Sequence, residues 1–195
     1  MQKTKGFTLI ELLIVIAIIA VLAVVVVLTL NPAELLRQAR DSTRLSDVAA
    51  YNSALAFYLA DIPGGFHSTS TSRCYAHGVS TATACQGTTT GMGFATAIPA
   101  ITTSATRTIN GTGWLPLTFN LISSGSPFGI LPIDPLNNSQ YYYRIALGTA
   151  STYKIIADME STKFSFSVGT GGSDVEEPDG GTNTQLYEAG NDLAL

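Results

Sequence analysis

Hydrophobic and polar positions divide this chain into an apolar N-terminal run, an amphipathic helix, a polar middle and an alternating C-terminal part. Between Phe7 and Leu30 the only charged side chain is that of Glu11. As an α-helix these residues would span about 36 Å, which exceeds the hydrocarbon core of a bilayer at about 30 Å. A charge inside such a helix costs free energy and usually has a partner. The run therefore predicts a membrane-spanning helix in which Glu11 requires a cation.

A second helical pattern follows over residues 31–62. Pro32 cannot donate a helical hydrogen bond, so we expect a kink or a break beside it. Apolar residues then recur at helical spacing and predict a stripe that packs on a sheet, and Pro63-Gly64-Gly65 ends the helix. The stripe consists of Val48, Tyr51, Leu55, Tyr58, Leu59 and Ile62.

Charged residues of alternating sign precede that stripe at spacings of three and four residues. The spacing allows ion pairs along the helix, such as Glu34 with Arg37 and Arg37 with Asp41. One interpretation is a solvated helix face, and the alternative is a set of contacts with neighbouring molecules. The residues concerned are Glu34, Arg37, Arg40, Asp41, Arg44 and Asp47.

Three segments near the C-terminus alternate apolar and polar residues with period two, which is typical of strands with one buried face. Short connectors predict an antiparallel meander, closed by the segment 187–193, and we interpret the aromatic residues as core. Before these strands, residues 131–138 combine two prolines with Asp and Asn side chains, which is turn chemistry. The predicted core faces carry Tyr141, Tyr143 and Ile145; Tyr153, Ile155 and Ala157; and Phe164, Phe166 and Val168.

The segment 63–130 is rich in Ser, Thr, Ala and Gly and lacks a periodicity that would assign its secondary structure. Its composition suits surface loops or O-linked glycan attachment. It holds the two cysteines, Cys74 and Cys85, which outside the cytoplasm would form a disulfide worth about 3 kcal/mol. The alternative is a zinc site that adds His67 and His77 to the two thiolates, although the spacing matches no strong finger pattern.

The net charge of −4 and the pI near 5.0 argue against a nucleic-acid binder with a broad basic surface. Charged residues form only 12% of the chain, which suits an extracellular domain. No catalytic constellation is recognisable, so we do not expect an enzyme. The Gly-rich segment 169–181 gathers four carboxylates of the kind that calcium prefers, with Asp174, Glu177 and Asp179 as candidate ligands, or it is a solvated acidic loop.

Three interpretations of the N-terminus compete. A secretory signal peptide would have a shorter apolar run, and a plain signal anchor leaves Gly6 and Glu11 unexplained. The third rests on Lys5-Gly6-Phe7-Thr8-Leu9-Ile10-Glu11, which resembles the class III signal of type IV pilins and type II secretion pseudopilins. The resemblance implies that prepilin peptidase cuts between Gly6 and Phe7 and methylates the amine of Phe7. That amine would supply the cation for Glu11, in a neighbouring subunit or in the same chain.

The resemblance implies an α+β, type IV pilin-like fold, in which a long N-terminal hydrophobic helix packs on an antiparallel sheet. We expect a cleaved leader (1–6), a membrane and filament-core helix (7–30), its amphipathic half (31–62), an insert with the disulfide (63–130), and the sheet with an acidic loop (131–195). Leu131 to Asn138 and the acidic segment are also similar to major pseudopilins, although Leu136, Asn137 and Asn138 depart from the pattern.

The function implied is that of a structural subunit of a type IV pilus-like filament. Alternatives are a major pseudopilin of type II secretion and a minor pilin acting as an adhesin or in DNA uptake. The implied partners are prepilin peptidase, copies of the chain, minor pilins, an inner-membrane assembly platform and the membrane, without nucleic acid. The chain would cross the inner membrane once with its C-terminus outside, before entering an extracellular pilus or a periplasmic or cell-wall pseudopilus. No cofactor is required, with calcium as the one candidate.

Overall fold

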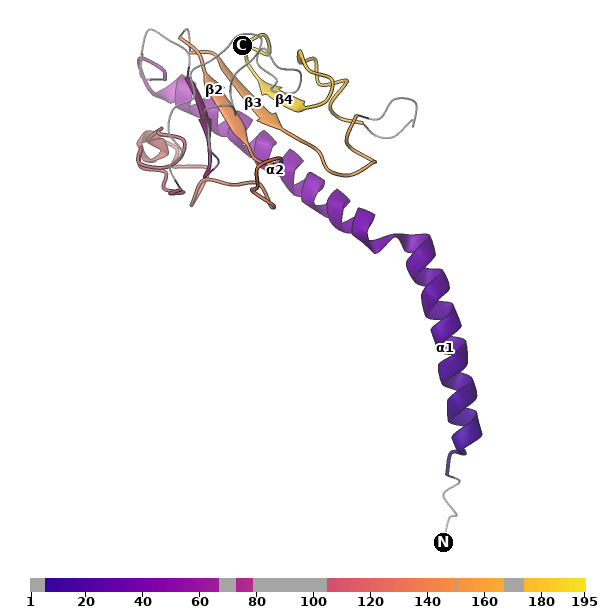
Figure 1. The fold of residues 1–195 in the computed structure, drawn as a ribbon. Coiled ribbons are helices and arrows are strands. Elements are labelled where there is room, and N and C mark those ends of the chain that lie inside the picture. The colour runs from indigo at the N-terminus through magenta and orange to yellow at the C-terminus, as the bar shows by residue number, and fades with distance from the viewer. Residues whose placement is uncertain (1–5, 67–72, 79–104, 150, 167–173) are drawn as a thin grey trace. The chain divides into compact units, whose positions relative to one another are not determined.

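A computed structural model describes residues 6–66, 73–78, 105–149, 151–166 and 174–195. The chain forms two compact units, Met1–Arg37 and Gln38–Leu195. The first contains the apolar helix, and the second is an α+β head built from a helix and a four-stranded sheet (Figure 1). This arrangement is pilin-like and confirms the predicted fold class.

Helix α1 spans Leu9–Leu30 and helix α2 spans Pro32–Asp61. Asn31 separates them in a left-handed conformation (φ 40°, ψ 71°), which Asn tolerates better than most residues. Pro32 occupies the first position of α2, where its missing N–H is not needed and its fixed φ suits the helix. The predicted break beside Pro32 is thus confirmed.

The head contains strands β1 Arg73–Ala76, β2 Arg144–Leu147, β3 Tyr153–Ala157 and β4 Tyr187–Gly190. They form one antiparallel sheet in the order β1-β2-β3-β4 (Figure 1). Strand β4 is the predicted closing element. Strand β1 comes from the segment 63–130, so the sheet does not consist of the C-terminal part alone.

The predicted strand that carries Phe164, Phe166 and Val168 is wrong. Residues 161–165 form a turn in which the amides of Phe164 and Ser165 donate to the carbonyl of Ser161. The Ser165 hydroxyl donates to that carbonyl as well, at 2.7 Å. These local bonds replace a strand ladder, which the alternation of Phe164 with Phe166 could not reveal. Val168, the third residue of the predicted face, lies outside the described residues.

The main core lies between α2 and one face of the sheet. Tyr51 and Leu55 of α2 are fully buried with Ile145 and Ile155, which pair directly across β2 and β3. The predicted helix stripe is therefore confirmed, as are the predicted core residues Tyr143, Ile145, Tyr153, Ile155 and Ala157. Tyr141 is the exception, because it lies before β2 and its ring contacts Arg44. Aromatic rings fill this core, and Tyr51 alone has ring contacts with Trp114, Phe128 and Tyr143.

The opposite face of the sheet is buried too, against the C-terminal segment. Lys154 of β3 and Glu188 of β4 form an ion pair of 2.8 Å with no exposed side-chain surface. The Lys154 ammonium also donates to the Thr182 hydroxyl and to the carbonyl of Leu193. Buried ions need such additional partners to offset their desolvation. A small apolar cluster completes this face, consisting of Cys74, Ala76, Tyr142, Ala146, Ile156 and Leu186.

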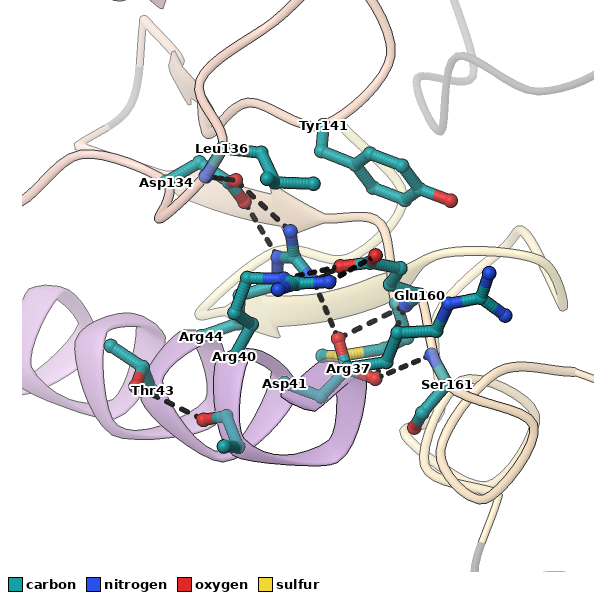
Figure 2. A network of polar contacts seen from close by, with 12 residues as sticks. Arg37, Arg40, Asp41, Thr43, Arg44, Asp134, Leu136, Tyr141, Glu160 and Ser161 are labelled. Carbon is teal, nitrogen blue, oxygen red and sulfur yellow. Dashed lines mark hydrogen bonds and ion pairs between the residues drawn. The ribbon is translucent and has the colours of Figure 1, made fainter. Parts of the chain in front are cut away.

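A buried guanidinium joins α2 to two loops of the head. The Nε and Nη2 of Arg44 donate to both oxygens of Asp134, at 2.6 and 3.0 Å, and its Nη1 donates to Asp41 at 2.6 Å (Figure 2). The Tyr141 ring lies 4.9 Å from its central carbon. Asp41 in turn accepts the amide of Ser161 at 2.7 Å. One side chain therefore connects residues 90 positions apart in sequence.

The predicted turn at residues 131–138 is confirmed and gains this second role. Asp134 Oδ1 accepts the amides of Leu136 and Asn137, at 2.8 and 3.2 Å, as turn chemistry requires. The same carboxylate is the partner of Arg44 and is only 2% exposed. Asp134 thus fixes the turn and attaches it to the helix.

The interpretation of the charged stretch of α2 as a solvated face is wrong for two of its members. Asp41 and Arg44 are both fully buried, because each finds ionic and backbone partners beyond the helix. The predicted pair of Glu34 with Arg37 does form, at 3.7 Å, with Arg37 half-exposed. Spacing along the helix could not separate a surface pair from a buried one.

Replacing Arg44 tests how much the head depends on this junction. We expect Arg44→Ala to lower the free energy of unfolding by about 3–5 kcal/mol, because it leaves two buried carboxylates without a cation. Arg37→Ala removes an equal charge from a half-exposed pair and should cost about 1 kcal/mol or less. Urea unfolding of the full chain in detergent, followed by the fluorescence of the single, buried Trp114, measures both. If the two variants lower the free energy of unfolding by amounts that agree within 1 kcal/mol, the head does not depend on the Arg44 junction.

Candidate processing and assembly site

The chain is not helical around the expected processing site. Residues 6–8 precede the first turn of α1, and Phe7 is 81% exposed. Thr8 is the N-cap in an extended conformation (φ −85°, ψ 152°). The Gly6–Phe7 peptide bond therefore lies in irregular, exposed backbone. A peptidase needs such backbone, because helical hydrogen bonds would otherwise have to open first.

Thr8 and Glu11 form a capping box that fixes this helix start. Glu11 Oε2 accepts the amide of Thr8 at 2.9 Å and its hydroxyl at 2.6 Å, while the Glu11 amide donates to the Thr8 hydroxyl at 3.3 Å. The bonds satisfy backbone donors that the first turn leaves unpaired. They also direct the Glu11 carboxylate toward the end of the helix at which Phe7 lies. Thr8 is therefore a partner of Glu11 within its own chain that was not predicted alongside Phe7, although the Thr-x-x-Glu spacing of a capping box is present in the sequence.

Helix α1 has no buried residue along its 22 positions. It is long and apolar enough to cross a membrane, and it is the one such helix in the part of the chain that the structure describes. A helix that is apolar on all sides requires lipid or other helices around it. Its surface and the single carboxylate near its start are what a neighbouring molecule would meet.

The family that matches this chain is described as the prokaryotic N-terminal methylation motif, and it covers residues 1–27. No curated protein and no solved structure matches the chain. The match includes Gly6, Phe7, Thr8 and Glu11. The chain thus carries the signal of type IV pilins and pseudopilins, which implies processing by prepilin peptidase and filament assembly. An apolar helix behind this signal fits membrane anchoring before assembly.

The cysteine and histidine candidates lie in different surroundings. Cys74 is fully buried in β1, whereas Cys85 and His67 lie outside the described residues, so the disulfide stays a prediction. His77 Nε2 donates to the carbonyl of Ala105 at 3.1 Å, and its Nδ1 therefore accepts from Asn137 Nδ2 at 3.0 Å. Both nitrogens hold loops together, and this does not favour the zinc alternative.

The acidic segment uses its carboxylates mainly on its own backbone. Asp179 accepts the amides of Gly181 and Glu188, and Asp174 accepts the amide of Glu176. Within the described residues, no three acidic, histidine or cysteine side chains lie close enough together to hold a metal ion. Asp174, Glu177 and Asp179 are therefore not brought together as a calcium site, and calcium binding stays a prediction.

Glu176 is the carboxylate of this segment that sequence analysis did not single out. It is 2% exposed and accepts the amides of Met159 and Phe166, at 3.0 and 2.5 Å. Burial raises the pKa of Glu176 to about 8, more than these two bonds lower it, and the charges of Asp158 and Asp174 add to the rise. Its side chain connects the end of β3 to Phe166, which directly follows the turn at residues 161–165.

This carboxyl makes the head less stable as the pH rises. The folded-state pKa of Glu176 lies above its ordinary value of 4.5, so the stabilisation is complete below pH 4.5 and is lost as the pH rises through about 8. Each pKa unit by which the folded state differs from the unfolded state is worth about 1.4 kcal/mol. We therefore expect the free energy of unfolding to fall by several kcal/mol across that pH window. Unfolding of the full chain in detergent at intervals from pH 4.5 to 8.5 measures the slope.

Glu176→Gln removes this titrating group and should reduce the slope, even if it lowers stability at acidic pH by placing an amide donor opposite a backbone N–H. Part of the slope should remain, because burial also raises the pKa of Asp158, to about 6. Glu177→Gln is the matched control, because Glu177 is the exposed neighbour and its replacement should leave the slope unchanged. If the free energy of unfolding depends equally on pH in the Glu176→Gln variant and the parent chain, Glu176 is not the group that titrates in this window.

Proposed function

We propose that this chain is a structural subunit of a bacterial type IV pilus-like filament, assembled through its N-terminal helix after cleavage between Gly6 and Phe7. The observation that carries the proposal is the methylation motif over residues 1–27, joined to a helix α1 that has no buried residue. A helix of this kind can be surrounded by the lipid of a bilayer or by copies of itself. The chain can therefore exist first as a membrane protein and then as a filament subunit.

Cleavage supplies the charge that assembly requires. The new amine of Phe7 stays cationic after methylation, and Glu11 is the one acidic side chain of α1. In a filament the amine of one subunit pairs with the Glu11 carboxylate of its neighbour, in place of the Thr8 bonds. Each subunit then contacts one neighbour through its Phe7 amine and another through its Glu11 carboxylate. Contacts between two different surfaces of this kind generate an open helical assembly.

The charges flanking α1 orient the precursor. Lys3 and Lys5 precede the helix and favour a cytoplasmic N-terminus, with the head outside. Removing residues 1–6 lowers the count of basic residues from 10 to 8 against 14 acidic ones, so the formal charge changes from −4 to −6. The mature head is acidic.

A second candidate is the major pseudopilin of a type II secretion system, which has the same processing and helix. Two features favour it, namely the Asp134-Pro135 turn before β2 and the acidic segment of residues 174–179. Asp174 and Asp179 each also accept backbone amides, so a calcium ion bound in that role would share these carboxylates with the backbone. Assignment as a minor pilin for adhesion or DNA uptake has no comparable support in the described residues.

Mass spectrometry of the N-terminal peptide distinguishes these assignments. We expect a peptide that begins with N-methylated Phe7 in material sheared from the cell surface, because a pilus extends beyond the envelope. The membrane fraction of the same cells serves as the comparison. The same peptide confined to membranes would favour the pseudopilus, and a chain that retains Met1 or Gln2 would refute the filament and leave a plain anchor.

Glu11→Ala tests the assembly role of the carboxylate. We expect the variant to be cleaved and inserted but to yield at least tenfold fewer sheared filaments, because the Phe7 amine would be buried without a partner, at about 3–5 kcal/mol per subunit. Glu177→Ala removes the same charge from an exposed site of the head and should assemble normally. Normal filament yield from the Glu11→Ala variant would exclude the proposed pairing.

A further inference from the structure

The head contains two copies of the tripeptide pattern that accepts N-linked sugars, Asn-x-Ser/Thr with x other than proline. One is Asn110-Gly111-Thr112 and the other is Asn137-Asn138-Ser139. A pattern this short occurs by chance, so its sequence alone decides nothing. The structure distinguishes the two sites by the state of each acceptor nitrogen.

Asn110 is exposed, and its side-chain hydrogen bonds use the oxygen and not the nitrogen. Its Oδ1 accepts the amide of Thr112 at 3.2 Å and the hydroxyl of Thr112 at 2.7 Å. A backbone N–H can only donate, so the side-chain atom facing it is the oxygen and the amide orientation is fixed. Asn110 and Thr112 are both exposed, and no described residue accepts a hydrogen bond from Asn110 Nδ2.

The loop that carries Asn110 is held rigidly. Asn110 forms a bridge with Thr118, and the carbonyl of Ile109 accepts the amide of Phe119 at 2.9 Å. Gly111 has φ +89°, and a Cβ at that position would lie 2.7 Å from the Thr118 hydroxyl, so glycine is required there. The buried Trp114 anchors the loop in the core. A transferase would therefore meet a preformed turn.

In the second tripeptide, the acceptor nitrogen already takes part in a hydrogen bond within the head. Asn137 has φ 43°, its Nδ2 donates to His77 Nδ1 at 3.0 Å, and its Oδ1 is buried. Modification of that nitrogen would break the contact that joins β1 to the Asp134 turn. The two sites thus form a matched pair with the same pattern and opposite accessibility.

We infer that Asn110 is an N-glycosylation site of this protein and that Asn137 is not. The co-reactant is a sugar activated as a phosphate or diphosphate ester. Asn110 Nδ2 attacks the anomeric carbon, the nitrogen–carbon bond forms as the carbon–oxygen bond to phosphate breaks, and a base of the transferase takes one Nδ2 proton. The two donors from Thr112 stabilise negative charge on Oδ1 and so ease loss of that proton.

The inference requires a head exposed to a glycosyltransferase, which the proposed export of the head would provide. It does not depend on filament formation. Detection of methylated Phe7 in the same sample tests the proposed function separately, so either conclusion can fail without the other.

The test is peptide mapping of the full chain purified from the cells that produce it. After enzymatic release of N-linked sugar in heavy-oxygen water, we expect Asp with heavy oxygen at position 110 and unmodified Asn at 137. Spontaneous deamidation of Asn110, which its Gly111 neighbour favours, would before release give Asp with ordinary oxygen. The heavy oxygen therefore distinguishes sugar release from earlier deamidation. The variants Asn110→Gln and Thr112→Val should lose the glycopeptide at least tenfold, whereas Thr112→Ser and Ser139→Ala should keep it.

Melting temperatures of the variants show that the loss is not one of folding. An unmodified peptide at Asn110 in the parent chain overturns the inference. So does a glycopeptide retained by the Asn110→Gln variant, or a sugar found on Asn137 in place of Asn110.

Discussion

The attachment of α2 to the turn before the sheet depends on the buried guanidinium of Arg44. Arg44 has no exposed side-chain surface, and its charge is tolerable because Asp41 and Asp134 surround it with three hydrogen bonds and Glu160 lies 3.5 Å from its Nη1. The two aspartates come from the same helix and from the turn before the sheet, and Asp41 extends the junction to the amide of Ser161. The position of the helix on the sheet is thereby specified by charge as well as by apolar packing, which alone tolerates small slips.

Periodicity explains which parts of the fold were predictable. Tyr51 and Leu55 lie on one side of a helix for the same reason that Tyr153 and Ile155 lie on one side of a strand, because backbone geometry alone assigns their faces. The N-terminal signal was equally readable, since its residues act within a single turn of helix. Helix faces, strand faces and the N-terminal signal could therefore be inferred, because each is a pattern of residues close together in sequence.

Apart from the Thr8–Glu11 capping box, whose spacing is local, the features that sequence reasoning missed have partners far away in the chain. Arg44 looks like one charge among several on a helix until Asp134, 90 residues later, is placed beside it. Phe164 and Phe166 alternate like a strand, yet the amide of Phe166 binds Glu176 instead of a neighbouring strand. Glu176 resembles its acidic neighbours, and only tertiary packing shows that it alone is buried.

Arg44 and Glu11 show two ways in which a protein accommodates a charge among apolar groups. The chain supplies every partner of Arg44 itself, so that charge is compensated as soon as the head folds. Glu11 has only the neutral donors of Thr8 within its own first turn, which satisfy hydrogen bonding without balancing the charge. In the proposed filament, the counter-charge of Glu11 is the amine that cleavage creates on Phe7 of a neighbouring subunit. Under that proposal assembly depends on processing, because the Phe7 amine exists only after residues 1–6 are removed.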